Sequence, residues 1–362
     1  MRSVSVIIPT WNGRELLAEF LPSVFAALDE YRDRHAAAVE LLVVDDASTD
    51  DTLDWLRATH SEQSALRVVA LAENLGFLRA VNRGFAEARH DIIFLLNNDV
   101  RVEADAIAPL VGHFDDGHVF AVCSKAYRLG TDFLDGAGKL GRFERGFWRV
   151  FLNYDILPTR LPAGAAPFPS FFASGGYVAY DAQKLATLGG FCEWLAPNYW
   201  EDVEICYRAW KRGWSVAYEP ASVVHHVSSA TLGDARQHRV RLITERNRLL
   251  MTWIHLHDPA WFAAHLAWLG VKLMGAAVSL DRDYWRSFRQ ALARLRPIRQ
   301  LRRQEKAAAR RSDRELAAIF TELAASAWVA VMRNVKDYDQ YLRLRRELET
   351  DSTQAVDHGF RH

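Results

Sequence analysis

Short apolar runs alternate with amphipathic stretches over the first hundred residues. The runs at 4–8, 40–44, 67–71 and 92–96 are rich in Val, Ile and Leu. Between them, apolar residues recur at helical spacing over 13–31, 50–58 and 77–88. Strands that are apolar on both faces and alternate with helices are typical of a parallel sheet covered on both sides. The pattern therefore predicts an α/β fold with a mostly parallel, Rossmann-like sheet.

Polar residues gather directly after these predicted strands. Ligands of open parallel sheets bind outside the carboxyl ends of the strands. The residues at these ends are Pro9, Thr10 and Trp11, then Asp45 and Asp46, then 74–79, and finally Asn97, Asn98 and Asp99. We expect them to lie together.

The remainder of the chain has a different pattern. Residues 119–227 are rich in Gly, Pro and aromatics and predict short strands, with 132–168 as a long loop region. From residue 232 onward the spacing is predominantly helical. The most apolar segment, 261–280, carries His265 and Lys272, which favours a buried or interfacial amphipathic helix over a transmembrane one.

Composition narrows the function. Equal numbers of basic and acidic residues give a formal net charge of zero, so no bulk field favours a nucleic-acid partner. The three cysteines are too scattered for a disulfide framework or a zinc site, which favours a reduced, cytoplasmic setting. The N-terminal apolar run is too short for the core of a signal peptide.

Three acidic clusters could carry chemistry, and each has a plainer interpretation. Asp46 could accept a hydrogen bond from a pyrimidine base, or the pair Asp45-Asp46 could cap a helix. Asp99 beside two amides could hold a divalent cation, or the three residues could form a turn. One acid of Glu201-Asp202-Val203-Glu204 could be a general base, or all could be partners of the helix dipole.

Two further features lie near these acids. Trp200 would offer a sugar an apolar wall, and Arg208 and Arg212 could pair with the acids or with phosphate. His225 and His226 end a predicted strand, so their rings should point to opposite faces, and one of them could join Asp99 as a metal ligand.

The order and spacing of these motifs resemble family 2 glycosyltransferases of the GT-A fold, especially the rhamnosyltransferase-like members. The similarity runs over about 3–230 and rests on several motifs: residues 6–13, 43–50, Asn74-Leu75-Gly76-Phe77 with Asn82, 95–100, Ser174-Gly175-Gly176, Gly189-Gly190-Phe191, 201–204 with Arg208 and Gly213, and 220–226.

The resemblance implies a role for individual residues. Asp202 would be the catalytic base, with Glu201 as a supporting acid. Asp99 and His226 would bind a divalent cation, Mg²⁺ or Mn²⁺, although Asn97 replaces the first acid of the family's Asp-x-Asp motif. Gly175, Gly176 and Trp200 would contact the acceptor. The nucleotide would be bound by Pro9, Thr10, Trp11, Asp46, Asn74, Gly76, Arg79, Asn97 and Asn98.

The resemblance also implies the reaction. It would be an inverting transfer from a UDP- or dTDP-sugar to a hydroxyl of a glycan or glycolipid, with a rhamnosyltransferase of cell-surface polysaccharide synthesis as one such enzyme. A catalytically weak nucleotide-sugar-binding protein is the alternative, and a sugar nucleotidyltransferase is disfavoured because no basic phosphate loop follows the first strand.

The sequence also predicts how the chain is divided. We expect a glycosyltransferase domain over 1–230, with a nucleotide-binding half (1–118) and an acceptor-binding half (119–230), followed by a helical region over 231–362. The stretch 281–315 holds many Lys and Arg interleaved with aromatics. It is either a solvated helical face or a peripheral contact with the cytoplasmic face of an anionic membrane.

Overall fold

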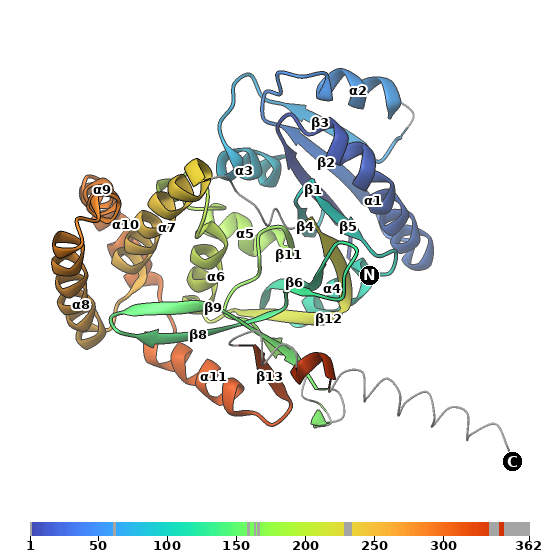
Figure 1. The fold of residues 1–362 in the computed structure, drawn as a ribbon. Coiled ribbons are helices and arrows are strands. Elements are labelled where there is room, and N and C mark those ends of the chain that lie inside the picture. The colour runs from blue at the N-terminus through green and yellow to red at the C-terminus, as the bar shows by residue number, and fades with distance from the viewer. Residues whose placement is uncertain are drawn as a thin grey trace, which may run out of the picture.

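The computed structural model describes residues 2–60, 63–157, 160–162, 164, 167–227, 234–332 and 340–343. Its first part alternates strands and helices as the apolar pattern predicts (Figure 1). The elements are β1 (Val4–Thr10), α1 (Arg14–His35), β2 (Val39–Asp45), α2 (Thr52–Thr59), β3 (Leu66–Ala70), α3 (Phe77–Glu87) and β4 (Ile92–Leu96).

The main sheet combines a parallel and a mixed half. Strands β3, β2, β1 and β4 are parallel neighbours in that order. The sheet continues through β11 (Tyr177–Asp181), antiparallel to β4, then β6 (Val119–Arg128), β12 (Ser215–His226) and β10 (Phe168–Pro169). The short strands β5 (Val100–Val102) and β7 (Leu134–Gly136) pair with β12 and β6. The α/β fold class is therefore confirmed.

Alternation along β1 produces a separate core on each face of the sheet. Val4, Val6 and Ile8 pack in the cluster that includes α1, and Ile7 packs in the one that includes α3. Because successive side chains of a strand point to opposite faces, both faces must be covered, and the helices cover them. Covered faces leave the sheet's carboxyl edge as the place where polar side chains collect.

The prediction of a long loop over 132–168 is wrong for most of this stretch. The chain there forms β7 and then a hairpin of β8 (Gly138–Glu144) and β9 (Phe147–Ile156), which joins β13 (Val329–Met332) in a second sheet. The glycines that suggested a loop have packing roles: a Cβ on Gly138 would lie 2.2 Å from the Tyr154 ring. Arg145 and Gly146 have positive φ, as a two-residue hairpin turn requires.

Beyond the sheet, short helices connect the strands and longer ones follow them. The connecting helices are α4 (Ile107–Gly112), α5 (Ala182–Leu188) and α6 (Glu201–Lys211). The later ones are α7 (Asp234–His255), α8 (Pro259–Val278), α9 (Arg282–Leu292), α10 (Leu295–Ala308) and α11 (Asp313–Ala325), which bear out the predicted helical C-terminal region.

The later helices are joined to α6 by buried charges. Asp313, 1% exposed, accepts hydrogen bonds from Lys211 Nζ at 2.6 Å and from the Tyr207 hydroxyl at 2.5 Å. Its other oxygen accepts the backbone N–H groups of His257 and Asp258 at 2.7 and 2.6 Å. One carboxylate thereby connects α6, the start of α8 and the start of α11. The domain boundary near residue 230 remains a prediction.

Removing this carboxylate should be costly. Asp313→Ala leaves the Lys211 ammonium buried without its partner, and such losses lower the free energy of unfolding by about 3–5 kcal/mol. Denaturant unfolding measures the change. Asp33→Ala is the control, since its side chain is 72% exposed and should change stability by less than about 0.5 kcal/mol. Equal stability of the two variants would contradict the role of Asp313.

Candidate active site

Two glycines join the ends of β4 and α6. The Gly176 carbonyl accepts the N–H of Asn97 at 3.0 Å, and the Gly175 N–H donates to Asp202 Oδ2 at 3.3 Å. A Cβ on Gly176 would lie 2.8 Å from Asn97 Nδ2, so a side chain there would displace Asn97. The predicted acceptor glycines, the predicted base and the Asn97-Asn98-Asp99 motif therefore share one continuous site.

Glu201 and Asp202 occupy the first turn of α6 in different environments. Burial and the neighbouring Asp202 raise the pKa of Glu201 to about 8, and one oxygen of Glu201 is buried without a hydrogen-bond partner. Burial also raises the pKa of Asp202, but its carboxylate accepts N–H groups from Val203 and Gly175 that favour ionisation. The two carboxyls therefore differ in their hydrogen bonding: two backbone N–H donors favour the ionised form of Asp202, whereas burial and the neighbouring Asp202 favour the protonated form of Glu201.

The chain enters α6 through a constrained turn. Tyr199 and Trp200 have φ of 70° and 73°, which non-glycine residues rarely adopt. Asn247 on α7 holds the turn by donating from Nδ2 to the carbonyls of Leu195, Asn198 and Tyr199 at 2.6, 3.0 and 2.7 Å. These hydrogen bonds fix the start of α6, the helix that carries the predicted catalytic base Asp202.

Glu204, the third acid of this motif, has a structural role rather than a place in the reaction. Glu204 is fully buried and pairs with Arg208 at 3.0 Å and with His255 Nε2 at 2.7 Å. Arg208 also donates to the carbonyls of Leu188 and Gly190 at 2.6 and 2.8 Å. Arg208 therefore anchors α6 to the loop after α5 rather than facing a substrate.

Asp99 and His226 lie side by side. His226 Nε2 is 3.4 Å from Asp99 Oδ2, and its Nδ1 is 2.8 Å from Asp135 Oδ2. Burial alone would lower the pKa of His226, but the two carboxylates outweigh it and raise that pKa to about 9. The neighbouring His225 turns the other way and contacts Glu103 at 2.8 Å, as strand alternation predicts.

The donor set fits a divalent cation. Asp99 Oδ1 and Asn97 Oδ1 are both buried without a hydrogen-bond partner, and His226 is next to them. Oxygen and imidazole donors suit Mg²⁺ or Mn²⁺. No three His, Cys, Asp or Glu side chains in the described part of the chain are already arranged as a ligand set. Both His226 nitrogens face carboxylates, so a cation would compete with a proton there.

Asp46, which is predicted to bind the pyrimidine base of the nucleotide, directly follows β2. Its two oxygens accept the N–H groups of Leu75 and Gly76 at 2.7 and 2.9 Å. This brings the 74–76 segment to the end of β2. Asp45 accepts the backbone N–H of Ser48 at 3.2 Å, and α2 begins after Asp51, so neither Asp45 nor Asp46 caps that helix.

Other predicted nucleotide-binding residues lie at the same edge. Pro9 and Thr10 end β1, and Asn98 Nδ2 donates to Thr10 Oγ1 at 3.0 Å. Trp11 is 54% exposed, which is unusual for so large an apolar side chain. Asn74 is also exposed, and Arg79 pairs with Glu193 on the surface at 3.3 Å.

Sequence reasoning missed two charged residues near the site. Asp135 on β7 contacts His226, and Lys139 on β8 is 7% exposed, close enough to Asp202 for their charges to interact. Both fall in the stretch predicted to be a loop. Neither belongs to a recognisable motif, so only the strand pairing could have placed them.

A groove opens beside Trp200. Its volume is about 630 Å³, and Trp200, Phe151, Trp148 and Phe320 form apolar walls. Arg142, Arg149 and Arg248 also line it, together with Glu144, which pairs with Arg142 at 2.9 Å. Trp200 directly precedes Glu201 and Asp202 in the chain, so one wall of the groove is continuous with the start of α6.

Comparison with protein families gives one match over half of the chain. A family model described as "Glycosyl transferase family 2" matches residues 5–188.

Curated relatives match over a shorter stretch. Undecaprenyl-phosphate 4-deoxy-4-formamido-L-arabinose transferase of Pseudomonas syringae is 32% identical over 33% of this chain and 34% of its own length. The protein of the same name from Klebsiella pneumoniae is 30% identical over 39% of this chain and 42% of its own. The chain thus spans well under half the length of these relatives. Neither is a rhamnosyltransferase.

Solved structures share the fold. GalNAc-T7 with UDP, GalNAc and Mn²⁺ aligns with a TM-score of 0.56 at 18% identity, covering 71% of this chain and 49% of that one. S. aureus TarS 1–349 aligns with a TM-score of 0.52 at 16% identity, covering 89% of this chain and 90% of that one. Mannosyltransferase PcManGT from Pyrobaculum calidifontis with GDP-Man and Mn²⁺ aligns with a TM-score of 0.50 at 20% identity, covering 90% of this chain and 86% of that one.

The raised pKa of Glu201 predicts a pH-dependent stability. Its carboxyl titrates near 4.5 when unfolded and near 8 when folded, so the wild type loses stability as pH rises between these values. Glu201→Gln removes this loss, and its gain in Tm over wild type should grow from pH 5 to pH 8 and then level off. Thermal melts at pH 5, 6.5, 8 and 9 measure it.

The control for this series is Glu322→Gln on the exposed face of α11. Its Tm difference from wild type should stay flat across the same pH values. A gain for Glu201→Gln that is constant or shrinks with pH would show that Glu201 is ionised in the folded protein.

Proposed function

The chain belongs to glycosyl transferase family 2, and we propose that it is an inverting enzyme that transfers a sugar from a UDP- or dTDP-sugar to a hydroxyl of a glycan or glycolipid. The observation that carries the proposal is the pairing of Asp202 with Glu201 beside the Gly175-Gly176 bridge. The Gly175-Gly176 backbone connects the Asp202 carboxyl to Asn97, two residues before Asp99.

Asp202 acts as the general base in this proposal. The acceptor hydroxyl attacks the anomeric carbon from the side opposite the nucleotide, and Asp202 takes its proton. Two N–H donors favour the ionised form of Asp202, whereas burial raises the pKa of the neighbouring Glu201 to about 8 and so favours its protonated form. A positioned base contributes about 10²–10⁴-fold to the rate. Inversion follows because the displacement is a single step.

The nucleotide binds along the edge formed by β1, β2 and β4. Pro9, Thr10 and Trp11 line the base pocket with Asp46, whose carboxylate retains lone pairs beyond the two backbone bonds. Asn74, Gly76 and Arg79 lie by the ribose and diphosphate, and Arg79 would exchange Glu193 for phosphate. Asn97 and Asn98 complete the nucleotide side.

Asp99 and His226 are the proposed ligands of a divalent cation. Such a cation supplies charge stabilisation to the departing diphosphate. The unpartnered oxygens of Asp99 and Asn97 support this assignment. Two of the solved structures that share the fold also carry Mn²⁺.

The acceptor enters through the groove at Trp200. Gly175 donates to Asp202, and Trp200, which precedes the acidic pair in the chain, lines the groove together with other aromatic side chains and arginines. A lipid-linked acceptor with a phosphate fits this combination, and the curated relatives are named for undecaprenyl phosphate. We therefore propose an anionic, lipid-linked acceptor in cell-surface polysaccharide synthesis. Rhamnose as the donor sugar remains a prediction.

Such an acceptor would place the enzyme at a membrane. We propose a cytoplasmic protein that contacts the cytoplasmic face peripherally. The described residues contain one helix long and apolar enough to span a membrane, α8. Release of nucleoside diphosphate from a panel of UDP- and dTDP-sugars tests the reaction class and identifies the donor. Binding of the sugars without any release would favour a protein that has lost catalysis.

The base assignment predicts a large, selective loss. Asp202→Asn should lower kcat by at least about 100-fold while leaving nucleotide affinity nearly unchanged. Glu201→Gln is the matched variant: an amide mimics the protonated carboxyl, so its rate should stay within about tenfold of wild type. Nucleoside diphosphate release and equilibrium binding measure both quantities. Near-normal turnover of Asp202→Asn would refute the assignment.

The cation assignment predicts a change in binding that does not depend on turnover. Asp99→Ala should abolish the increase in UDP or dTDP affinity that Mn²⁺ gives the wild type, as measured by calorimetry with and without the metal. Glu103→Ala, which removes the partner of the neighbouring His225, should keep that increase. An Asp99→Ala protein with full Mn²⁺ dependence would remove Asp99 from the ligand set.

A further inference from the structure

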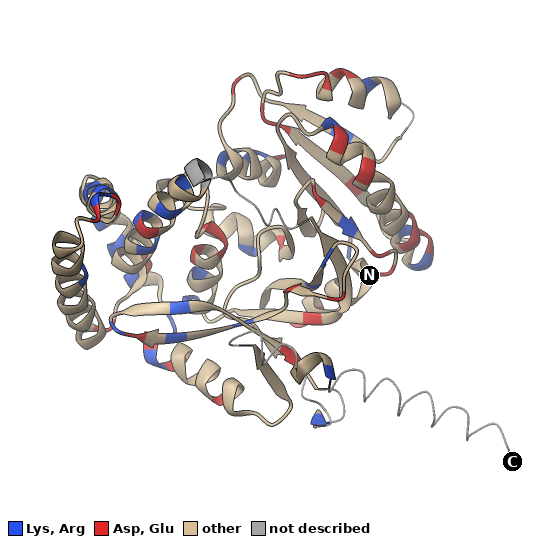
Figure 2. Cartoon of the chain, in the orientation of Figure 1, with Lys and Arg blue, Asp and Glu red and all other residues tan. Residues whose placement is uncertain are grey.

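Helix α8 presents an entirely apolar face to the outside. Its exposed large side chains are Leu266, Trp268, Val271, Met274 and Val278, and its other exposed positions are Ala, Gly or Pro. Met274 is 64% and Val278 88% exposed. In Figure 2 the helix is tan over almost its whole length. A contiguous exposed apolar face of this kind marks a site of contact with a protein or a membrane.

The other face of α8 is fixed to the protein. His265 is buried, with Nε2 accepting from Trp253 Nε1 at 3.0 Å and Nδ1 2.9 Å from the Gly146 carbonyl. Lys272, the only Asp, Glu, Lys or Arg in the helix, turns inward over the rings of Phe147 and Tyr284. A helix that crossed a membrane would lose these contacts, so α8 stays on the protein and exposes one side.

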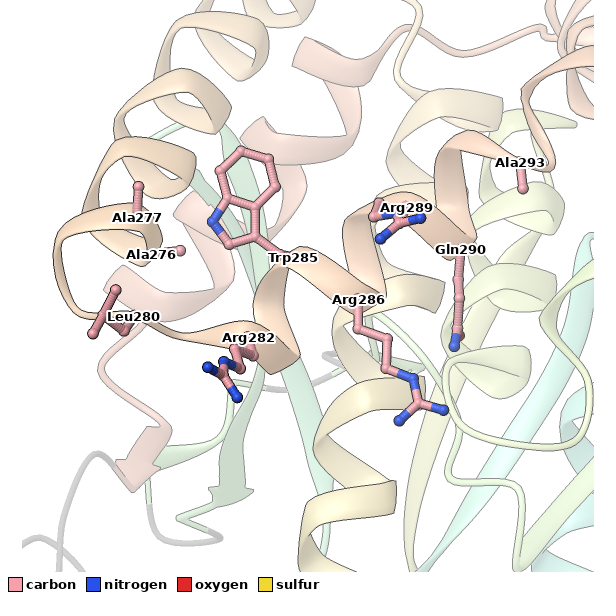
Figure 3. Close-up of a pocket in the computed structure, with 9 residues that line it drawn as sticks. All are labelled: Ala276, Ala277, Leu280, Arg282, Trp285, Arg286, Arg289, Gln290 and Ala293. Atoms are coloured by element: carbon pink, nitrogen blue, oxygen red, sulfur yellow. The ribbon is translucent and has the colours of Figure 1, made fainter.

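Helix α9 adds a basic stripe directly beside this face. Arg282, Trp285, Arg286 and Arg289 are exposed at helical spacing, and they line a groove of about 960 Å³ against the end of α8 (Figure 3). None of the described residues that line the groove is acidic. The two acids at the start of α9 are paired elsewhere, Asp281 with Arg241 and Asp283 with His238.

We propose that the exposed face of α8 and the arginine stripe of α9 form a docking surface for an anionic phospholipid bilayer, with α8 lying in the plane of the interface. Aliphatic and aromatic side chains flanked by cations are the composition of interfacial helices. Trp268 and Trp285 suit the headgroup level, because an indole has an apolar body and one polar group. The arginines then meet lipid phosphates.

A second copy of the chain fits this surface less well. In a two-fold dimer the same patch faces itself, so the arginine stripe of α9 would lie against or near its own copy. The described lining of the groove contains no carboxylate that would compensate that repulsion. A lipid surface supplies negative charge along the whole stripe.

This surface does not depend on the sugar-transfer chemistry. None of its residues belongs to the proposed catalytic, nucleotide or cation sites. Binding to vesicles is therefore measured separately from nucleoside diphosphate release, and failure of one does not imply failure of the other.

The test is flotation of the full chain with vesicles of phosphatidylcholine alone or with 30% phosphatidylglycerol, about a third anionic lipid. We expect flotation with the anionic vesicles, weakened at high salt. Arg286→Glu/Arg289→Glu should lower the partition coefficient at least about tenfold, since each basic residue near the surface contributes about fivefold. Arg34→Glu/Arg57→Glu makes the same charge change on α1 and α2 and should have little effect.

The apolar half of the surface has its own variant. Met274→Gln/Val278→Asn removes buried area in the membrane without adding charge, and should also weaken flotation about tenfold. Both positions are exposed in the free protein, so thermal melts and nucleotide binding should match wild type. Absence of flotation at low salt would overturn the proposal. So would a concentration-dependent dimer in light scattering that Met274→Gln/Val278→Asn dissociates.

Discussion

The site depends on one close approach, that of the Gly175-Gly176 backbone to the end of β4 on one side and to α6 on the other. The Gly176 carbonyl takes the N–H of Asn97, and the Gly175 N–H meets Asp202. A Cβ on Gly176 would push Asn97 aside, whereas one on Gly175 would make only an ordinary contact with Asp202 at 3.5 Å. The strictest steric requirement thus falls on Gly176. The distance between the cation-binding side and the base is set by backbone, which varies less than long side chains do.

Buried ion pairs hold helix α6, which carries the acidic pair of the site. Glu204 and Lys211 lie one at each end of α6, and each pairs with a group from a later helix, His255 and Asp313 respectively. A buried pair is not strong evidence for stability, because desolvation opposes the attraction between its charges. It does specify orientation, because an unpaired charge there would be costly. The two pairs thereby fix the position of α6, and with it the place of Glu201 and Asp202 in its first turn.

The sequence was sufficient for the parallel half of the fold because its signals are local. Apolar runs, helical spacing and the residues after each strand placed β1 to β4 within a few residues, and the family match confirmed the class. The hairpin of β8 and β9 was missed because glycines also favour loops, whereas here Gly138 packs against the Tyr154 ring and Gly146 has the positive φ of a two-residue turn. Asp135 and Lys139 lie in this stretch, and the sequence therefore did not predict their place near the site. Likewise, spacing alone did not separate Glu204 from Asp202; the resemblance singled out Asp202, and the structure pairs Glu204 with Arg208 and His255.

The proposed lipid surface and the proposed base are mechanically connected through α7. This helix packs against α9, and its Asn247 amide holds three carbonyls of the turn that leads into Trp200. The turn has positive φ at Tyr199 and Trp200, a conformation that persists only where surrounding contacts impose it. Contact with a membrane at α8 and α9 would therefore act on a rigid helix rather than on a loose extension. Helix α7 packs against α9 of the proposed lipid surface and holds the turn at Trp200, which lines the proposed acceptor groove. An acceptor anchored in a membrane bound at that surface would meet a groove whose orientation to the bilayer is already set.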